Sequence, residues 1–190
     1  RPWRRKFLGY TLSWHQKPRL KVAAESVRRF KEKLRGIVRQ NRSANLKHLA
    51  REQLTPLLRG WVNYFQLTET RGVVEELDQW LRRRVRMYYW KQWKRARGRR
   101  RNLIRLGIHP AEVYKATRSH RGYWWMAGTS IVQRALDTRW LAERGVPSIR
   151  QQWIEMHYGK QNEQFNPAAV NLTGTAGCGP ACPVVWEPGG

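Results

Sequence analysis

One stretch of this sequence concentrates side chains that can bind phosphate. Eleven Lys or Arg residues lie between positions 82 and 101, and no Asp or Glu occurs between Asp78 and Glu112. An exposed helix usually mixes both signs of charge to form i,i+4 ion pairs, whereas an unrelieved run of cations repels itself unless a polyanion neutralises it. Guanidinium groups clamp phosphates and also stack on bases, which suits irregular, folded RNA. The stretch therefore predicts a surface for nucleic acid.

Aromatic side chains in the same stretch could add stacking contacts. An exposed indole gives a base a platform worth about 1–3 kcal/mol. Trp90 is expected on the helical face that carries the cations, and a stacking role and a core role are equally open for it, whereas Trp93 is expected to pack. The candidate RNA-binding residues are Arg82, Arg83, Arg86, Trp90, Lys91, Lys94, Arg95, Arg97, Arg99, Arg100 and Arg101.

Residues that could support catalysis give no comparable pattern. Two-metal polymerase or nuclease chemistry needs two or three carboxylates around ions about 4 Å apart. The two aspartates, Asp78 and Asp137, are expected on separate helices. Neither the five histidines nor the pair Cys178 and Cys182 have the spacing of a zinc site or of a nucleophile with its base. We predict no catalytic residue, no metal site and no cofactor in this chain.

The charge of the whole chain agrees with a polyanionic partner. It holds 38 Lys and Arg against 13 Asp and Glu, a net charge of +25, which is more than solubility requires. An anionic membrane or an acidic protein could also meet that charge, but the 11 tryptophans favour nucleic acid. No apolar run reaches the roughly 18 residues of a membrane span. We expect a soluble, cytoplasmic protein with no membrane partner, and the first residue, Arg1, suggests part of a longer protein.

Hydrophobic periodicity predicts a mainly α-helical fold. Residues 6–14 alternate between apolar and polar and predict a short strand or hairpin arm. Apolar residues then recur at steps of three and four from Val22, from Leu54 and from Val73, and the third of these helices should reach the nineties. Its buried stripe would be Leu77, Leu81, Val85 and Tyr88, with Arg83, Arg86, Trp90, Lys94, Arg97 and Arg101 opposite. Shorter helices are expected at 111–119, 130–144 and 149–157.

Two positions in the second helix have specific expectations. Thr55 before Pro56 predicts an N-cap followed by proline in the first turn. Gly60 costs about 1 kcal/mol relative to Ala inside a helix, so it should mark the close approach of another backbone or of RNA. Close packing is the favoured explanation of the two.

Two motifs give the chain a family resemblance. Phe7-Leu8-Gly9-Tyr10 resembles the last palm motif of bacterial reverse transcriptases, and the stretch from Leu57 to Phe65 resembles the signature of the group II intron maturase-specific domain. The two motifs have the family's order and separation. The resemblance extends over about residues 6–158. Further similar segments within this range are 77–93, 106–107, 121–124 and 136–145.

This resemblance implies a helical thumb bundle that follows the palm of a group II intron reverse transcriptase and grips the intron RNA. Residues 1–20 would be the C-terminal remnant of the palm, 21–160 the maturase-specific helical domain, and 161–190 a disordered tail. The implied partners are group II intron RNA and, secondarily, target DNA, with Mg²⁺ needed only in the intact polymerase. The signature residues expected to pack are Gly60, Trp61, Asn63, Tyr64 and Phe65.

The chain also departs from the complete family pattern. Nothing in it resembles the Tyr-x-Asp-Asp motif that holds the polymerase metals, so polymerase activity does not carry over. The predicted function is an RNA-binding maturase domain that helps an intron fold and splice. Two alternatives stay open: the C-terminal part of an active RNA-directed DNA polymerase, and a generic basic protein that binds nucleic acid.

Overall fold

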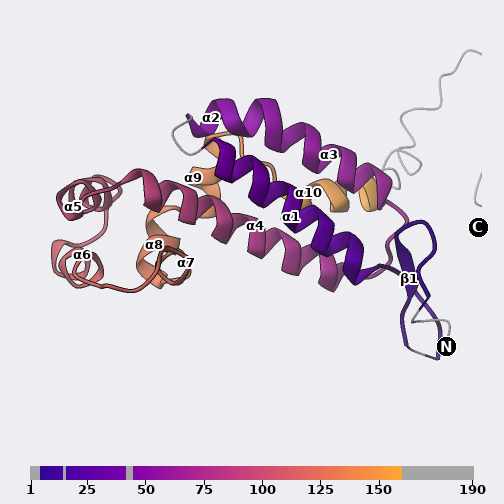
Figure 1. The fold of residues 1–190 in the computed structure, drawn as a ribbon. Coiled ribbons are helices and arrows are strands. Elements are labelled where there is room, and N and C mark those ends of the chain that lie inside the picture. The colour runs from indigo at the N-terminus through magenta and orange to yellow at the C-terminus, as the bar shows by residue number, and fades with distance from the viewer. Residues whose placement is uncertain (1–4, 15, 42–44, 160–190) are drawn as a thin grey trace, which may run out of the picture.

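The fold is mainly helical, with a short hairpin at its N-terminal end, as expected (Figure 1). A computed structural model describes residues 5–14, 16–41 and 45–159, and the structural statements below refer to these. The expected tail, with Cys178 and Cys182, lies outside the described residues.

The hairpin pairs β1 (Tyr10–Leu12) with β2 (Leu20–Val22) in antiparallel register, with Tyr10 opposite Val22. Gly9, at the entry to β1, has a φ of +81°, which L side chains rarely adopt. A Cβ at this position would also lie 3.2 Å from the ring of Phe65. Both the backbone conformation and the close contact therefore favour glycine at this position, where the hairpin packs on the helices.

Three helices form the main bundle and lie side by side in Figure 1: α1 (Ala24–Gln40), α3 (Thr55–Tyr64) and α4 (Arg71–Gln92). Each has an apolar stripe, and the stripes meet in a common core. Its fully buried members include Leu34, Leu58, Leu77, Leu81 and Val85. The amphipathic pattern thus predicted α1 and the buried stripe of α4 correctly.

The second predicted helix begins earlier than expected. α2 (Leu46–Leu49) is capped by Asn45, whose side chain accepts a hydrogen bond from the Lys47 N–H, and a π-helical turn (Ala50–Leu54) leads directly into α3. The prediction of an N-cap at Thr55 was therefore wrong. Pro56 lacks a backbone N–H, but it lies in the first turn of α3, directly after the wider π-helical turn, so the chain stays helical through it.

The basic stretch is divided between two helices, because the chain leaves helical geometry at Trp93, with φ −80° and ψ 69°, before α5 (Ala96–Arg105) begins. The single cationic face expected from Arg83 to Arg101 is therefore interrupted. α5 packs on α6 (Pro110–Thr117), and the two lie at the end of the bundle opposite the hairpin (Figure 1).

The remaining helices return along α4: α7 (Tyr123–Met126), α8 (Ser130–Ala135), α9 (Thr138–Glu143) and α10 (Ile149–Ile154), followed by a π-helical turn (Glu155–Gly159). The single helix expected at 130–144 is two helices. The Asp137 carboxylate accepts a 2.7 Å hydrogen bond from the Trp140 N–H and starts α9 as a new helix.

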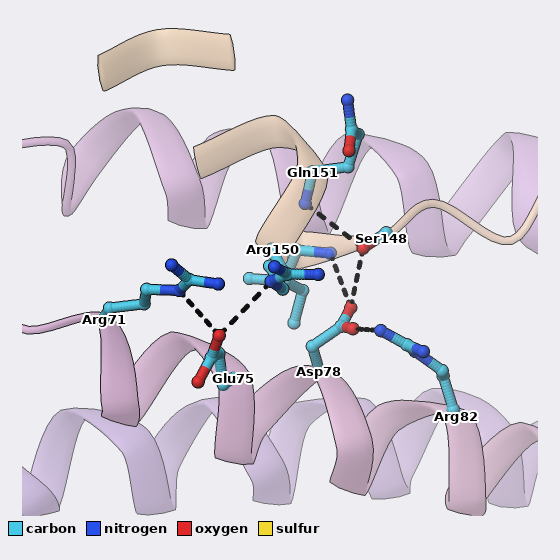
Figure 2. A network of polar contacts seen from close by, with 8 residues as sticks. Arg71, Glu75, Asp78, Arg82, Ser148, Arg150 and Gln151 are labelled. Carbon is cyan, nitrogen blue, oxygen red and sulfur yellow. Dashed lines mark hydrogen bonds and ion pairs between the residues drawn. The ribbon is translucent and has the colours of Figure 1, made fainter. Parts of the chain in front are cut away.

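A buried carboxylate attaches α10 to α4 (Figure 2). Asp78 is 1% exposed and accepts hydrogen bonds from the Ser148 hydroxyl (3.1 Å), from the Ile149 N–H (2.9 Å) and from the guanidinium of Arg82. Near it, Glu75 pairs with Arg71 and Arg150 at the surface. One carboxylate thus satisfies the N-terminus of α10 and a half-buried arginine.

None of the helices in the described ranges is both long enough and apolar enough to cross a membrane.

Candidate nucleic-acid interface

The structure sorts the predicted RNA-binding residues by exposure. Five are exposed on α4, on α5 or between them, and four are half-buried. The exposed residues are Lys91, Lys94, Arg95, Arg97 and Arg101. The half-buried residues are Arg82, Arg83, Arg99 and Arg100.

Two of the predicted contacts, Arg86 and Trp90, are buried. Arg86 is 8% exposed and its Nε donates a 2.8 Å hydrogen bond to the carbonyl of Leu136, while Trp90 is 1% exposed. Burial, followed by the charge of Arg82, lowers the pKa of Arg86. The expectation that Arg86 lies on an exposed face was wrong, because the chain at the end of α8 covers this side chain and supplies the Leu136 carbonyl. The Trp90 ring lies 4.9 Å from the guanidinium carbon of Arg99 and 6.0 Å from the ring of Trp93, measured from its centre. Trp90 takes the core role.

Arg82 also has a structural partner. Within the described residues it is the one member of the basic stretch that forms an ion pair, with Asp78. Burial, together with the charge of Arg150, lowers the pKa of Arg82. The other half-buried and exposed cations of the stretch therefore carry the positive potential that a ligand would meet.

A cluster of exposed aromatic rings lies beside these cations. α7 presents Tyr123, Trp124 and Trp125, which are 43%, 36% and 45% exposed, and we call these three residues the aromatic turn. The guanidinium carbon of Arg83 lies 4.4 Å from the centre of the Trp124 ring, and that of Arg121 lies 4.1 Å from the Trp125 ring. Such distances correspond to cation–π contacts.

The third ring of the aromatic turn contacts two cations. Lys91 and Arg99 approach the Tyr123 ring to 5.4 and 5.5 Å. On the neighbouring helix α6, Tyr114 is half exposed, and the guanidinium carbons of Arg100 and Arg118 lie 4.6 and 5.3 Å from the centre of its ring. Alternating cations and rings thus cover this end of the molecule, on helices α4 to α7.

Arg83 holds the aromatic turn in place. Its Nε and Nη2 donate hydrogen bonds of 3.1 and 3.0 Å to the carbonyl of Trp124. A Cβ at Gly128 would lie 2.8 Å from the Arg83 guanidinium, so a larger residue at this position would displace that side chain. Arg83 therefore both contributes charge and positions α7 on α4.

A second basic feature is a groove of about 800 Å³ between α1 and α4, which we call the α1/α4 groove. Its floor is apolar and includes Val38, Met87 and Tyr88. One carboxylate, Glu32, lines it together with five cations, which are Arg35, Arg39, Arg84, Lys91 and Lys94. The local charge is therefore strongly positive.

Among the described cations of this groove, Arg84 is the one with an unsatisfied buried nitrogen. It is half-buried, and its Nε has no hydrogen-bond partner among the described residues. Burial, and then the charge of Arg35, lower its pKa. A half-buried guanidinium whose buried Nε lacks an acceptor favours the binding of an anion. Sequence reasoning did not select Arg84 as a contact and had no means of finding Arg35 or Arg39, which only the packing of α1 brings to this place.

The signature residues occupy the join between α3 and the hairpin. Phe65 is buried, and half-buried Trp61 packs against Phe30 and Phe65 with ring centres 5.1 and 4.8 Å apart. Tyr64 is exposed, yet its hydroxyl donates to the Leu8 carbonyl at 3.0 Å.

The two remaining signature positions, Gly60 and Asn63, are exposed. A Cβ at Gly60 would meet nothing within 4 Å. The prediction of close packing at Gly60 was wrong, because this side of α3 faces outward rather than toward another element.

Among the described residues, no group of three or more His, Cys, Asp and Glu side chains lies close enough together to hold a metal ion.

The fold and this surface define a small helical module with a cationic, aromatic-rich exterior. Residues 27–107 match the family model of the group II intron, maturase-specific domain. The matched range begins within α1 and ends just after α5, and it contains the signature from Leu57 to Phe65. The predicted resemblance to this domain is therefore confirmed over that range. The hairpin and helices α6 to α10 lie outside the matched range. No curated protein matches the chain.

Proposed function

We propose that this chain is an RNA-binding maturase domain, which helps a group II intron to fold and splice and has no polymerase active site of its own. The family match supports the link to group II introns. The observation that carries RNA binding is the charge imbalance of the basic stretch, where Arg82 alone forms an ion pair within the described residues.

The physical argument rests on the cost of concentrating like charges. Exposed cations without carboxylate neighbours repel one another, and phosphates relieve that repulsion while releasing condensed counterions. Arginine predominates over lysine in the stretch, and its planar fork suits phosphates and bases in irregular RNA. Target DNA is a second polyanion that the same surface could bind.

The test is the affinity of the chain for a group II intron transcript as a function of salt concentration. Binding should weaken steeply between about 50 and 200 mM salt. Replacing the exposed cations Lys91, Lys94, Arg95 and Arg97 by Gln should weaken binding and reduce the slope of log K against log salt by about three to four.

A matched control removes the same charge elsewhere, by replacing Lys17, Lys47, Arg51 and Arg59, all exposed, with Gln. It should have a clearly smaller effect. Equal effects of the two variants would move the binding surface away from α4 and α5. Competition by random duplex DNA as effective as by the folded transcript would favour a generic nucleic-acid-binding protein instead.

A further inference from the structure

The aromatic turn exposes three consecutive large rings although the residues that follow it are buried. Met126 and Ala127 are 2% and 0% exposed and anchor the segment in the core. The fold thus fixes the turn through its C-terminal neighbours and leaves Tyr123, Trp124 and Trp125 at the surface. A compact exposed aromatic patch of this kind is typical of an interaction site.

The charge around the turn restricts the partner. Its rings lie within cation–π distance of Arg83, Lys91, Arg99 and Arg121. These cations disfavour an ordinary apolar protein surface, which would have to cover them without neutralising them. A partner with both phosphates and flat π systems satisfies the cations and the rings together, and that combination is a nucleotide chain.

The turn is already ordered for such contacts. Arg83 donates two hydrogen bonds to the Trp124 carbonyl, and Gly128 leaves just enough space for that guanidinium. The rings therefore stand on a fixed backbone, which reduces the ordering cost of binding.

A phosphate track adjoins the rings. Lys91 lies over the Tyr123 ring and also lines the α1/α4 groove, so the aromatic turn and the groove meet at this residue. Farther along the groove, Arg84 has a buried Nε without a hydrogen-bond partner among the described residues. A backbone that runs along the groove would bring its phosphates to Arg84 and its next bases to the rings.

We propose that the aromatic turn binds unpaired nucleotides of RNA, whose bases stack on Tyr123, Trp124 and Trp125 while the adjoining phosphates lie in the α1/α4 groove. This inference rests on the proposed function and adds to it the kind of RNA segment that is bound. The bases of a duplex are already stacked on one another and cannot offer their faces, so a loop, bulge or end is required.

The experiment compares two RNA probes of equal length, one fully paired and one with a central unpaired loop. The variant replaces Tyr123, Trp124 and Trp125 by Leu, and the control replaces Trp14 and Tyr158, which are exposed aromatics at other sites, by Leu. The triple variant should bind the looped RNA about tenfold more weakly or worse and should bind the paired RNA nearly as well as the unchanged chain. The control should bind both RNAs normally.

A second measurement uses the unchanged chain, so it does not depend on the folding of a variant. A photoreactive pyrimidine in the loop should crosslink to residues 121–128, and the same base within a duplex should not. Equal losses on both probes, no loss on either, or crosslinks confined to other segments would overturn the inference. If the unchanged chain bound neither RNA, the proposed function itself would fail.

Discussion

The hydroxyl of Ser148 donates a 3.1 Å hydrogen bond to the carboxylate of Asp78, which lies seventy residues earlier in the chain (Figure 2). Asp78 also accepts from the Ile149 N–H and pairs with Arg82. One of the two aspartates of the sequence thus joins the start of α10 to the middle of α4. Asp78 is therefore a structural residue, and its role did not follow from the sequence.

Replacing Asp78 with Ala should destabilise the fold by about 3–5 kcal/mol, because it leaves half-buried Arg82 and the start of α10 without an acceptor. Urea unfolding measures the loss. Glu75→Gln is the matched control, since Glu75 lies one turn away and pairs with arginines at the surface, where such pairs contribute at most about 1 kcal/mol. Similar losses for both variants would contradict the role given to Asp78.

The contact between the hairpin and α1 should depend on pH. A hydrogen bond from Lys6, and then the charge of Arg29, lower the pKa of Glu25 below its ordinary value of 4.5. The contact is therefore fully present above the unfolded-state pKa and is lost as pH falls through the lower pKa of the folded state. An NMR titration of the Glu25 carboxyl should show this shift, and the signals of Lys6 should change in the same pH range.

In Glu25→Gln, that acid transition should be absent. High salt should weaken the effect, because both partners are near the surface. A Glu25 titration at the ordinary value would show that the contact with Lys6 does not persist in solution.

Buried and exposed cations of the basic stretch should respond in opposite ways to substitution. Arg86→Ala removes a buried charged donor from the Leu136 carbonyl and should reduce the free energy of unfolding by about 2 kcal/mol, with little change in RNA affinity while the chain stays folded. Lys94→Ala should change stability by less than about 0.5 kcal/mol. It should reduce the salt slope of RNA binding by about one.

Thermal unfolding and RNA titration of these two variants separate structure from binding. If Arg86→Ala stays folded and loses more RNA affinity than Lys94→Ala does, Arg86 contacts RNA and the structural role given to it is wrong.

Gly60→Ala should stabilise the domain by about 0.5–1 kcal/mol. The position is inside α3, where Ala is the better helix former, and a Cβ there meets nothing within 4 Å. Chemical unfolding tests this directly. A fall in RNA affinity in the same variant would instead show that RNA approaches α3 at Gly60, the second explanation that the sequence allowed for this glycine.

Several elements of the fold were predictable because they depend on local pattern alone. α1 and α4 follow from apolar residues at helical spacing, and the signature around Trp61 identified the family that matches residues 27–107. The hairpin followed from the alternation near Tyr10.

The candidate site was less predictable, because it depends on which helices cover α4. Periodicity correctly predicted that Val85 is buried, but it predicted an exposed face opposite. Instead, Arg86 is covered by the chain around Leu136, fifty residues later, and Trp90 is buried with Arg99 and Trp93 beside its ring. The aromatic turn lies on α7, a helix of four residues, which is too short for a periodic signal. Arg84 gained its place only through the packing of α1.

The covering of α4 on both sides has a mechanical consequence. α4 contacts both the earlier and the later parts of the chain, since Glu76 pairs with Lys31 of α1 and Arg86 donates to the Leu136 carbonyl. The buried residues before and after α4 belong to one core cluster. Neither part can separate from α4 without exposing apolar surface, so the helices that precede α4 and those that follow it should lose their structure in one cooperative transition.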